Sequence, residues 1–248
     1  ILVLMLVLWP LMRLETSAES IQVFASLEAP KEITYSETGE RMEVSTPAGT
    51  TTSITLDDGT QVLLSANSRL EYSKSFSADK REVKLVGEAR FNVAKDAERP
   101  FIVHTRQLQT QVLGTVFDVK AYPQTPADVT LYEGKVEVSL NGDAPQLMQP
   151  GEQAFLDKEG KLQLAKASEE TGKWAEGEFA FDNRDLKSVM QEIGSWYNIS
   201  VVFHSRPLLE ERIYFRMERV KEVKGVLQVL NDMGIAKFEI VDDRIVVK

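Results

Sequence analysis

The residues best suited to chemistry are few in this sequence, and they are not spaced for it. There are two histidines, His104 in FIVHTR and His204 in FHSRP. Neither belongs to an H-E-x-x-H pair or to another pattern that presents metal ligands on one face. We therefore expect surface or half-buried histidines on strands, and no metal site.

Nucleophile and phosphate-binding motifs are also missing. The sequence has no cysteine, which excludes disulfides, thiolate catalysis and cysteine-based metal sites within it. It has no G-x-S-x-G elbow and no glycine-rich phosphate loop after a strand pattern. A Ser/His/Asp site assembled from distant positions stays open. These absences favour a binding or signalling protein without catalytic residues or a cofactor.

Two pairs of adjacent carboxylates, Asp57-Asp58 and Asp242-Asp243, contain the residue type that glycosidases use. Hydrolysis of a glycosidic bond needs two carboxyl groups that face each other across a substrate, at roughly 5 to 9 Å. Adjacent side chains in a tight turn point in different directions, so turn formation is the favoured role of both pairs.

Composition indicates a chain with two folded domains and an acidic surface. The 248 residues are 43% hydrophobic, which is enough to form real cores, and the net charge is −9. This charge would repel a phosphate backbone, so nucleic acid is a poor candidate partner.

The first residues, ILVLMLVLWPLM, are almost all apolar, but they are too few to cross a bilayer of about 30 Å as a helix. We interpret residues 1–12 as the end of a transmembrane helix; a trimmed signal peptide and a buried strand are the alternatives. Residues 13–44 are then a juxtamembrane stalk. This flank has no excess of Lys and Arg, which indicates that the rest lies outside the cytoplasm.

Residues 45–165 show short alternating apolar runs separated by glycines, which predicts an all-β domain, either a sandwich or a coiled antiparallel fold. Hairpin turns are expected at Asp57 to Gly59, Glu133-Gly134, Asn141-Gly142 and Lys158 to Gly160, because glycine accepts the positive φ of tight turns. Apolar patterning lapses at residues 166–178, which we interpret as a linker.

Residues 179–248 change to a small βαβ-βαβ module of α+β type, so the whole chain is mainly β with α+β. The apolar faces of two helices recur at i, i+3, i+4 and i+7, with both helices on one side of a sheet. These faces are Leu186, Val189, Met190 and Ile193, then Val223, Val226, Leu227 and Leu230.

The last strand, formed by Arg244, Ile245, Val246, Val247 and Lys248, follows a turn at Asp242-Asp243 and has no later element to cover it. We interpret it as a sheet edge that could accept a partner strand; a strand that only closes the sheet is the alternative. The aromatic residues Trp174, Phe179, Phe181, Trp196 and Tyr197 are expected to pack between linker, sheet and helix, with an exposed partner surface as the alternative.

Several motifs in fixed order make the sequence resemble the FecR-type transmembrane anti-sigma regulators of Gram-negative bacteria. The motifs run from Asp58-Gly59-Thr60 to Tyr72, from Arg81 to Val93, through Arg99-Pro100-Phe101, from Val112 to Tyr122 and from Val129 to Val138. The tail is similar to the secretin and TonB short N-terminal module. The motif residues, which we regard as structural, are Gly59, Gly87, Gly114, Thr115, Phe117, Gly134 and Val136, then Trp174, Phe179, Phe181 and Leu186.

The resemblance implies a single-pass protein of the inner membrane whose present portion lies in the periplasm. Its expected partners are the periplasmic signalling domain of a TonB-dependent, SusC-like outer-membrane transporter and an extracytoplasmic-function sigma factor. The sigma factor would be bound by a cytoplasmic domain that this sequence lacks. Two other interpretations stay open: a periplasmic β-sandwich enzyme acting on glycans, and a structural adaptor of an envelope secretion system.

Overall fold

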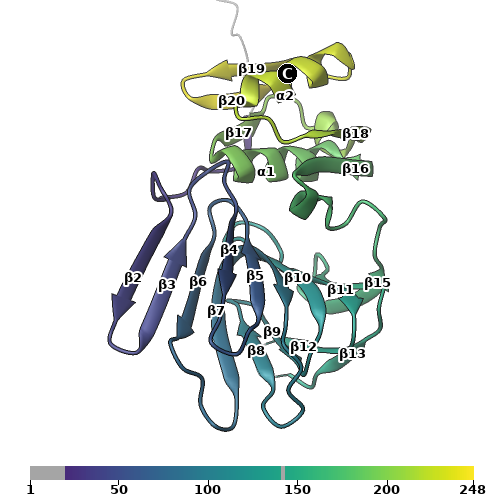
Figure 1. Ribbon diagram of the computed structural model, residues 1–248. Coiled ribbons are helices and arrows are strands. Elements are labelled where there is room, and N and C mark those ends of the chain that lie inside the picture. Colours follow the sequence, from purple (N-terminus) through teal and green to yellow (C-terminus); the bar gives the residue numbers. More distant parts are fainter. Residues whose placement is uncertain (1–19, 141–142) are drawn as a thin grey trace, which may run out of the picture.

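The computed structural model describes residues 20–140 and 143–248 and arranges them as two units, one above the other in Figure 1. The predicted end of a membrane helix at residues 1–12 and the predicted turn at Asn141-Gly142 lie outside the described residues. Within the described ranges, no helix is both long enough and apolar enough to cross a membrane.

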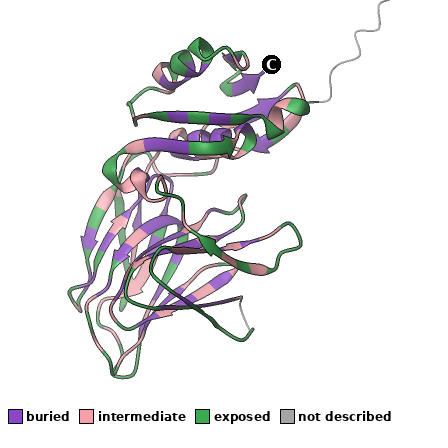
Figure 2. Cartoon of the chain, turned by 90° about the vertical axis from the view of Figure 1, so that its right-hand side faces the viewer, coloured by how far each residue is buried: buried purple, intermediate pink, exposed green. Residues whose placement is uncertain are grey.

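The N-terminal unit, residues 34–166, is a β-sandwich, which confirms the predicted all-β class. One layer contains β2 (Thr34–Thr38), β3 (Arg41–Ser45), β6 (Arg69–Ser73), β8 (Phe101–His104), β9 (Leu108–Val112), β12 (Val136–Leu140) and β13 (Gln146–Met148). The second layer contains β4 (Thr52–Thr55), β5 (Gln61–Leu64), β10 (Val116–Ala121), β11 (Asp128–Glu133), β14 (Glu152–Leu156) and β15 (Leu162–Lys166). Buried residues gather on the strands of the sandwich, while its lower loops are exposed (Figure 2).

The strand β7 (Arg81–Asn92) belongs to both layers. Its first half pairs with β6 and β8, and its second half pairs with β5 and β10. The change of layer occurs at Gly87, whose φ is +106° and where an added Cβ would lie 2.2 Å from Ser68 Oγ. Glycine is required there for both reasons, because other residues rarely adopt this φ and the approach leaves no room for a side chain.

Two other motif glycines, Gly114 and Gly134, lie where the chain passes from one layer to the other. The predicted hairpins at Gly59 and Gly160 are confirmed, but the one at Glu133-Gly134 is wrong. β11 pairs with β10 and β14, whereas β12 pairs with β9 and β13, so the two strands belong to different layers. At Gly134 the chain turns with φ +90° and packs against Gly114 and Thr115, leaving 2.8 Å between an added Cβ and Thr115 Oγ1.

The C-terminal unit combines two helices with two sheets. The predicted apolar faces form α1 (Leu186–Tyr197) and α2 (Val223–Asp232). The predicted arrangement on one sheet is wrong: β16 (Glu178–Asp185) and β18 (Arg212–Glu218) form a two-stranded sheet, and the other strands form a sheet of four. These are β1 (Ile21–Phe24), β17 (Ser200–Phe203), β19 (Phe238–Val241) and β20 (Arg244–Val247). α1 contacts strands of both sheets, because its buried residues extend around more than one face.

The predicted stalk at residues 13–44 is wrong for the part that the structure describes. β1 pairs with β17 and belongs to the C-terminal unit, although Ile21 and its partner Phe203 are far apart in the sequence. β2 and β3 belong to the sandwich. Pairing with distant strands thus brings these residues into the two folded units, although their short apolar runs and many charges are typical of an extended stalk.

The final strand is not a sheet edge. β20 lies between β17, to which it is parallel, and β19, to which it is antiparallel, so its hydrogen-bonding groups are used on both sides. Ile245, Val246 and Val247 are buried, and the hypothesis that Arg244 to Lys248 accepts a partner strand is wrong. The turn at Asp242-Asp243 is confirmed, with both residues at positive φ. It returns the chain beside β19 and into the space next to β17.

Candidate functional site

The candidate functional site is the interface between the two units. It begins with four charged residues on the outward face of the second layer, where Phe91, Phe117 and Val119 point inward to the core. Arg90 pairs in register with Asp118, and Glu88 with Lys120. Residues at alternate positions of a strand share a face, and opposite charges directly across from each other stabilise the pair of strands. We call these four residues the charged square.

The C-terminal unit and the linker cover much of the charged square, so that Glu88 and Asp118 are buried and Arg90 and Lys120 are half-buried. Figure 1 shows α1 on the side of the C-terminal unit that faces the sandwich. Glu192 of α1 accepts from Lys120 Nζ at 3.0 Å and from Arg219 Nη2 at 3.2 Å. The Arg219 guanidinium also lies over the rings of Trp196 and Phe179, at 4.3 and 4.7 Å from the ring centroids. Glu192 therefore links a cation of one unit to a cation of the other.

The carboxyl groups at this interface have opposite pKa displacements. Burial raises the pKa of Glu88 to about 7, and the nearby Glu192 carboxylate adds to the effect while Lys120 and Arg219 oppose it. Burial also acts to raise the pKa of Glu192, but Lys120 and Arg219 overcome it and hold that pKa at about 2. The pKa of Lys120 lies above its ordinary value because Glu192 and Glu88 outweigh the effect of burial. The pKa of the Glu88 carboxyl thus lies near neutral pH, whereas that of Glu192 lies far below it.

A second cluster fastens the linker to the same face. Asp118 accepts from Arg90 Nε at 2.7 Å, from Arg90 Nη2 at 2.9 Å, from Tyr132 Oη at 2.8 Å and from Trp174 Nε1 at 2.9 Å. Trp174 lies in the short 3₁₀-helix η1 (Lys173–Glu176) and is buried. Charged hydrogen bonds of this kind contribute about 1.5 to 3 kcal/mol each when they are buried. We call this cluster the linker clamp.

Gly172 completes the linker clamp. Its carbonyl accepts from Arg90 Nη2 at 3.1 Å, and its φ is +91°. An added Cβ would lie 2.2 Å from Tyr132 Oη and 2.5 Å from Arg90 Nη2. At this φ a residue other than glycine is strained, and its Cβ would have to displace the ends of the Tyr132 and Arg90 side chains that form the clamp.

The upper end of the sandwich makes direct backbone contacts with α1. Gly49 N donates to Trp196 O at 2.9 Å, and the Asn67 side-chain amide donates to Ser195 O. Ser65 Oγ, Asn67 Oδ1 and Ser195 Oγ are buried there without a hydrogen-bond partner in the described part of the chain. A buried polar atom without a partner costs about 1 to 3 kcal/mol. This part of the interface is less well satisfied than the linker clamp.

The interface does not have the shape of a ligand site. The cavity bordered by Glu88, Lys120, Glu192 and Arg219 has a volume of about 10 Å³. Small-molecule sites typically have volumes of about 300 to 1,000 Å³. What this arrangement supports is attachment of one unit to the other through paired charges and hydrogen bonds.

The predicted motif residues have structural positions, and one of them contributes to this site. Trp174 is part of the linker clamp. Phe117 and Val136 are in the sandwich core, and Phe179, Phe181 and Leu186 are in the core of the C-terminal unit. Gly59, Gly87, Gly114 and Gly134 have positive φ, and Thr115 Oγ1 donates to Lys135 O. Burial of Trp174, Phe179, Phe181 and Trp196 fits the packing interpretation of the aromatic residues.

Sequence reasoning missed most of the interface: Glu88, Arg90, Asp118, Lys120, Glu192 and Arg219. A signal was present, because GEAR and FDVK each carry charges two residues apart on strands with an apolar alternate face. That pattern ordinarily indicates a solvated face. Nothing local to these strands shows that another unit covers it.

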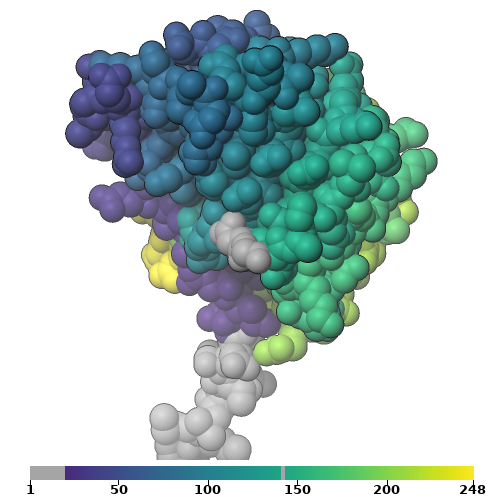
Figure 3. All heavy atoms as spheres, turned by 90° about the horizontal axis from the view of Figure 1, so that it is seen from below, coloured from purple at the N-terminus to yellow at the C-terminus, as the bar shows by residue number. Residues whose placement is uncertain are grey.

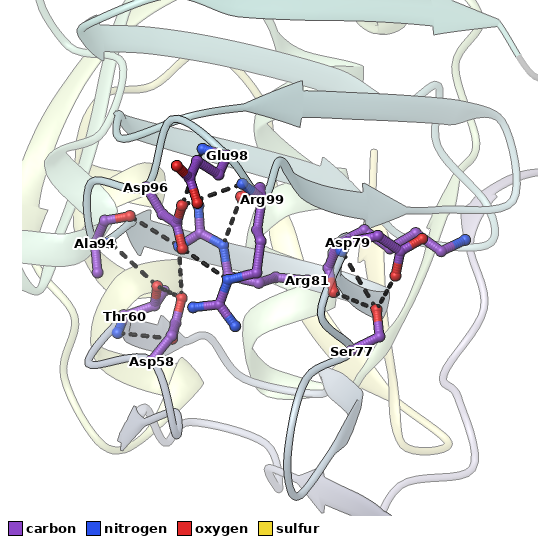
Figure 4. A network of polar contacts seen from close by, with 10 residues as sticks. Asp58, Thr60, Ser77, Asp79, Arg81, Ala94, Asp96, Glu98 and Arg99 are labelled. Atoms are coloured by element: carbon purple, nitrogen blue, oxygen red, sulfur yellow. Dashed lines mark hydrogen bonds and ion pairs between the residues drawn. The ribbon is translucent and has the colours of Figure 1, made fainter.

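The paired carboxylate Asp58 lies in a different network at the lower end of the sandwich. The Arg81 side chain is fully buried, and its Nη1 donates to Asp58 Oδ2 at 2.7 Å and to Ala94 O at 2.8 Å (Figure 4). Its Nε donates to Arg99 O at 3.0 Å. Arg81 begins β7 and Ala94 follows its end, so this side chain joins the two layers that β7 connects.

This network leaves little basis for glycoside chemistry at the aspartate pairs. Asp58 also accepts from the Thr60 backbone and hydroxyl, so its carboxylate is occupied by structural hydrogen bonds. Asp242 and Asp243 are exposed in the hairpin before β20. In the described ranges, no group of three or more His, Asp or Glu side chains is placed to hold a metal ion. Figure 3 shows the lower end of the molecule, where residues of the N-terminal unit cover most of the surface.

Comparisons with known proteins agree with this division into units. The family model described as FecR protein matches residues 42–137, and the model described as FecR, C-terminal matches residues 178–247. The two matched ranges lie in the N-terminal and C-terminal units, on either side of the linker. No curated protein sequence matches the chain at a significant level.

Two crystal structures, each described as that of a putative anti-sigma factor from Parabacteroides distasonis ATCC 8503, are similar to most of this chain. The structure at 1.65 Å resolution has 31% sequence identity and a TM-score of 0.75, covering 83% of this chain and 98% of the other. The structure at 2.50 Å resolution has 30% identity and a TM-score of 0.74, covering 84% of this chain and 98% of the other.

Proposed function

Because the chain belongs to the FecR family of anti-sigma regulators, we propose that it is the periplasmic sensory part of a single-pass regulator in the inner membrane of a Gram-negative bacterium. Its role is to relay a nutrient-uptake signal from a TonB-dependent, SusC-like transporter to an extracytoplasmic-function sigma factor. The C-terminal unit receives the periplasmic signalling domain of the transporter, and a cytoplasmic domain outside this sequence holds the sigma factor.

The observation that supports a relay is the polar interface between the units. Two units joined by a continuous apolar core would behave as one rigid body. Here the two core clusters are separate except for Ala66, a sandwich residue in the core of the C-terminal unit, and the contact includes the Lys120–Glu192 ion pair, the linker clamp and several buried polar atoms left unpartnered. Interfaces of this polar type resemble those between separable proteins, and relative motion of the units is the ordinary expectation. A partner that binds one unit can therefore change how it sits on the other.

The first test of this proposal is direct binding. The chain from residue 20 onward is titrated with the isolated periplasmic signalling domain of its cognate transporter, and the heat of binding is measured. Saturable binding of one domain per chain is expected. The control is the same titration with the N-terminal unit alone, residues 34–166, once circular dichroism shows that it is folded; this unit is expected not to bind.

The second test follows the signal in cells. A sigma-dependent reporter is measured with the full-length regulator, in strains with the intact transporter and with a transporter that lacks its signalling domain. The nutrient should change reporter output in the first strain and not in the second. Absence of binding together with identical reporter responses in both strains would contradict the proposed relay.

A further inference from the structure

The segment from Ile21 to Leu27 is the only described part of the chain between residue 20 and the linker that joins the C-terminal unit as a strand. Ile21, Gln22 and Phe24 pair with Phe203, Val202 and Val201 of β17. Phe24 is buried, and an added Cβ at Gly194 of α1 would lie 2.9 Å from its ring. β1 therefore occupies an edge of the four-stranded sheet and packs closely against α1.

After β1, two side-chain amides hold the backbone of the segment. Ala25 N donates to Gln124 Oε1 at 2.8 Å, and Gln124 Nε2 donates to Ala25 O at 2.7 Å. Leu27 N donates to Asn198 Oδ1 at 2.6 Å, and Asn198 Nδ2 donates to Leu27 O at 2.8 Å. Each amide supplies one donor and one acceptor, as a neighbouring strand would. This recognition depends on the backbone of the segment and not on its side chains.

The two amides come from different units. Gln124 lies in the connection between β10 and β11 of the sandwich, and Asn198 is the left-handed residue that ends α1. Gln191 of α1 also donates to Val23 O at 3.0 Å, and Ser26 N donates to Ser200 Oγ at 2.9 Å. The segment is held at both amides only while the two units are docked.

The Gln124 contact is coupled to the charged interface through β10. Lys120 lies near the end of β10, four residues before Gln124, and its ammonium group pairs with Glu192 of α1. Movement of the sandwich away from α1 would break this ion pair and withdraw Gln124 from Ala25 together. The state of the interface is thus transmitted to the backbone at Ala25.

We propose that residues 21–27 form an output strap, which both units grip when docked and which loosens when they separate. The part of this inference that concerns signalling rests on the proposed function, in which the residues before the strap lead to the membrane. The grip itself is a property of the folded chain and can be tested without a transporter or a sigma factor.

The grip is tested by hydrogen exchange with mass spectrometry on the chain from residue 20 onward. Gln124→Ala removes both hydrogen bonds to Ala25, and Gln124→Glu keeps the acceptor but loses the donor. We expect exchange across residues 21–27 to accelerate about tenfold in the first variant and less in the second, because local opening needs fewer hydrogen bonds to break. The control, Gln228→Ala, changes an exposed glutamine of α2 and should leave this exchange unchanged.

Coupling is tested with Lys120→Ala, which leaves the strap and both of its amides intact. This variant should also accelerate exchange across residues 21–27, in addition to exchange at α1. Acceleration at α1 alone would show that the interface and the strap are independent, and unchanged exchange in Gln124→Ala would show that the amide does not hold the segment. Either result overturns the proposal.

The signalling part is tested by introducing Gln124→Ala into the full-length regulator with the sigma-dependent reporter. The expected result is a changed reporter level without the nutrient, with Gln228→Ala behaving as the wild type. If the wild type responds to the nutrient but Gln124→Ala leaves the uninduced level unchanged, the strap is not the output. If the wild type does not respond, the proposed function fails while the exchange results still decide whether the grip exists.

Discussion

Replacement of Glu88 by Gln isolates the effect of a carboxyl group whose pKa is raised to about 7 by burial. Glutamine has nearly the same shape but cannot ionise. The charged groups that act on Glu88 remain in place: Lys120 and Asp118 on the adjacent strand, Glu192 on α1, and Arg219 after β18. A pH-dependent difference between the variant and the wild type therefore reports the ionisation of Glu88.

The direction in which stability changes with pH follows from the number of protons bound by Glu88 in the folded and unfolded states. The pKa of Glu88 is about 7 in the folded chain and 4.5 in its ordinary state. Between these values the folded protein keeps a proton that the unfolded chain releases, so the stability of the wild type falls as pH rises. Below 4.5 both states are protonated and Glu88 contributes nothing. Above 7 the full cost of enclosing the ionised carboxylate is present.

The size of the stability difference follows from the folded and ordinary pKa values of Glu88. They differ by about 2.5, and each pKa unit corresponds to about 1.4 kcal/mol, so the cost approaches about 3 kcal/mol at pH 8. Glu88→Gln should therefore gain up to about 3 kcal/mol of stability relative to the wild type between pH 4.5 and pH 8. Glu192 contributes in another window: its pKa of about 2 gives stability that is lost only as pH falls below its ordinary 4.5.

The assay is urea unfolding of the chain from residue 20 onward, measured at about pH 5, 6, 7 and 8. Tryptophan fluorescence is a suitable signal because Trp174 and Trp196 both lie at the interface. The matched control is Glu133→Gln, which changes an exposed glutamate at the end of β11. If the stability of Glu88→Gln runs parallel to that of the wild type across this range, Glu88 does not titrate near neutrality and the argument from burial is refuted.

Three other substitutions test the remaining structural arguments by urea unfolding. Arg81→Met leaves the Asp58 carboxylate buried without its cation and should lower the free energy of unfolding by about 3 to 5 kcal/mol. Adding Asp58→Asn removes the unpaired charge, so the double variant should regain part of this loss. Gly172→Ala should lower the free energy of unfolding by at least about 1 kcal/mol more than Gly160→Ala. Both glycines have positive φ, but only a Cβ at residue 172 would meet other atoms. Equal losses in the two variants would contradict the close approach of the linker to Tyr132 and Arg90. Trp174→Phe keeps an aromatic ring but loses the pyrrole ring and its N–H donor to Asp118, and should cost about 2 kcal/mol. An unchanged unfolding midpoint would contradict the linker clamp.

The local elements of this fold could be predicted because each has its own period in the sequence. Alternating apolar residues predict β10 through β12, and spacing of three and four residues predicts the buried faces of α1 and α2. Positive φ at Gly59 and Gly160 follows from hairpin chemistry alone. These features depend on a few neighbouring residues, which a single sequence contains.

The assignment of strands to layers could not be predicted in the same way. Gly134 has the positive φ that a turn requires, but φ does not tell whether the chain returns beside the same strand or crosses to the opposite layer. The pairing of Ile21 with Phe203 and the insertion of β20 between β17 and β19 depend on contacts between distant residues. Local propensity does not determine such contacts, so the stalk and the edge strand were predicted wrongly.

The two parts of the interface differ in how completely their polar groups are satisfied, and this difference bears on where separation would begin. Asp118 accepts four hydrogen bonds, from Arg90, Tyr132 and Trp174, so its carboxylate gains nothing from exposure to water. The contact with α1 instead contains Glu88, whose ionised form is disfavoured by burial, and polar atoms without partners.

If the units separated, water would bind the polar atoms beside α1 that have no partner in the docked state. At the linker clamp, water would only replace hydrogen bonds that Asp118 already accepts. Opening is therefore expected to start beside α1, with the clamp as the fixed point about which the C-terminal unit moves. Gln124 follows Lys120, which pairs with Glu192 of α1, so the output strap is held beside the contact that is expected to open first.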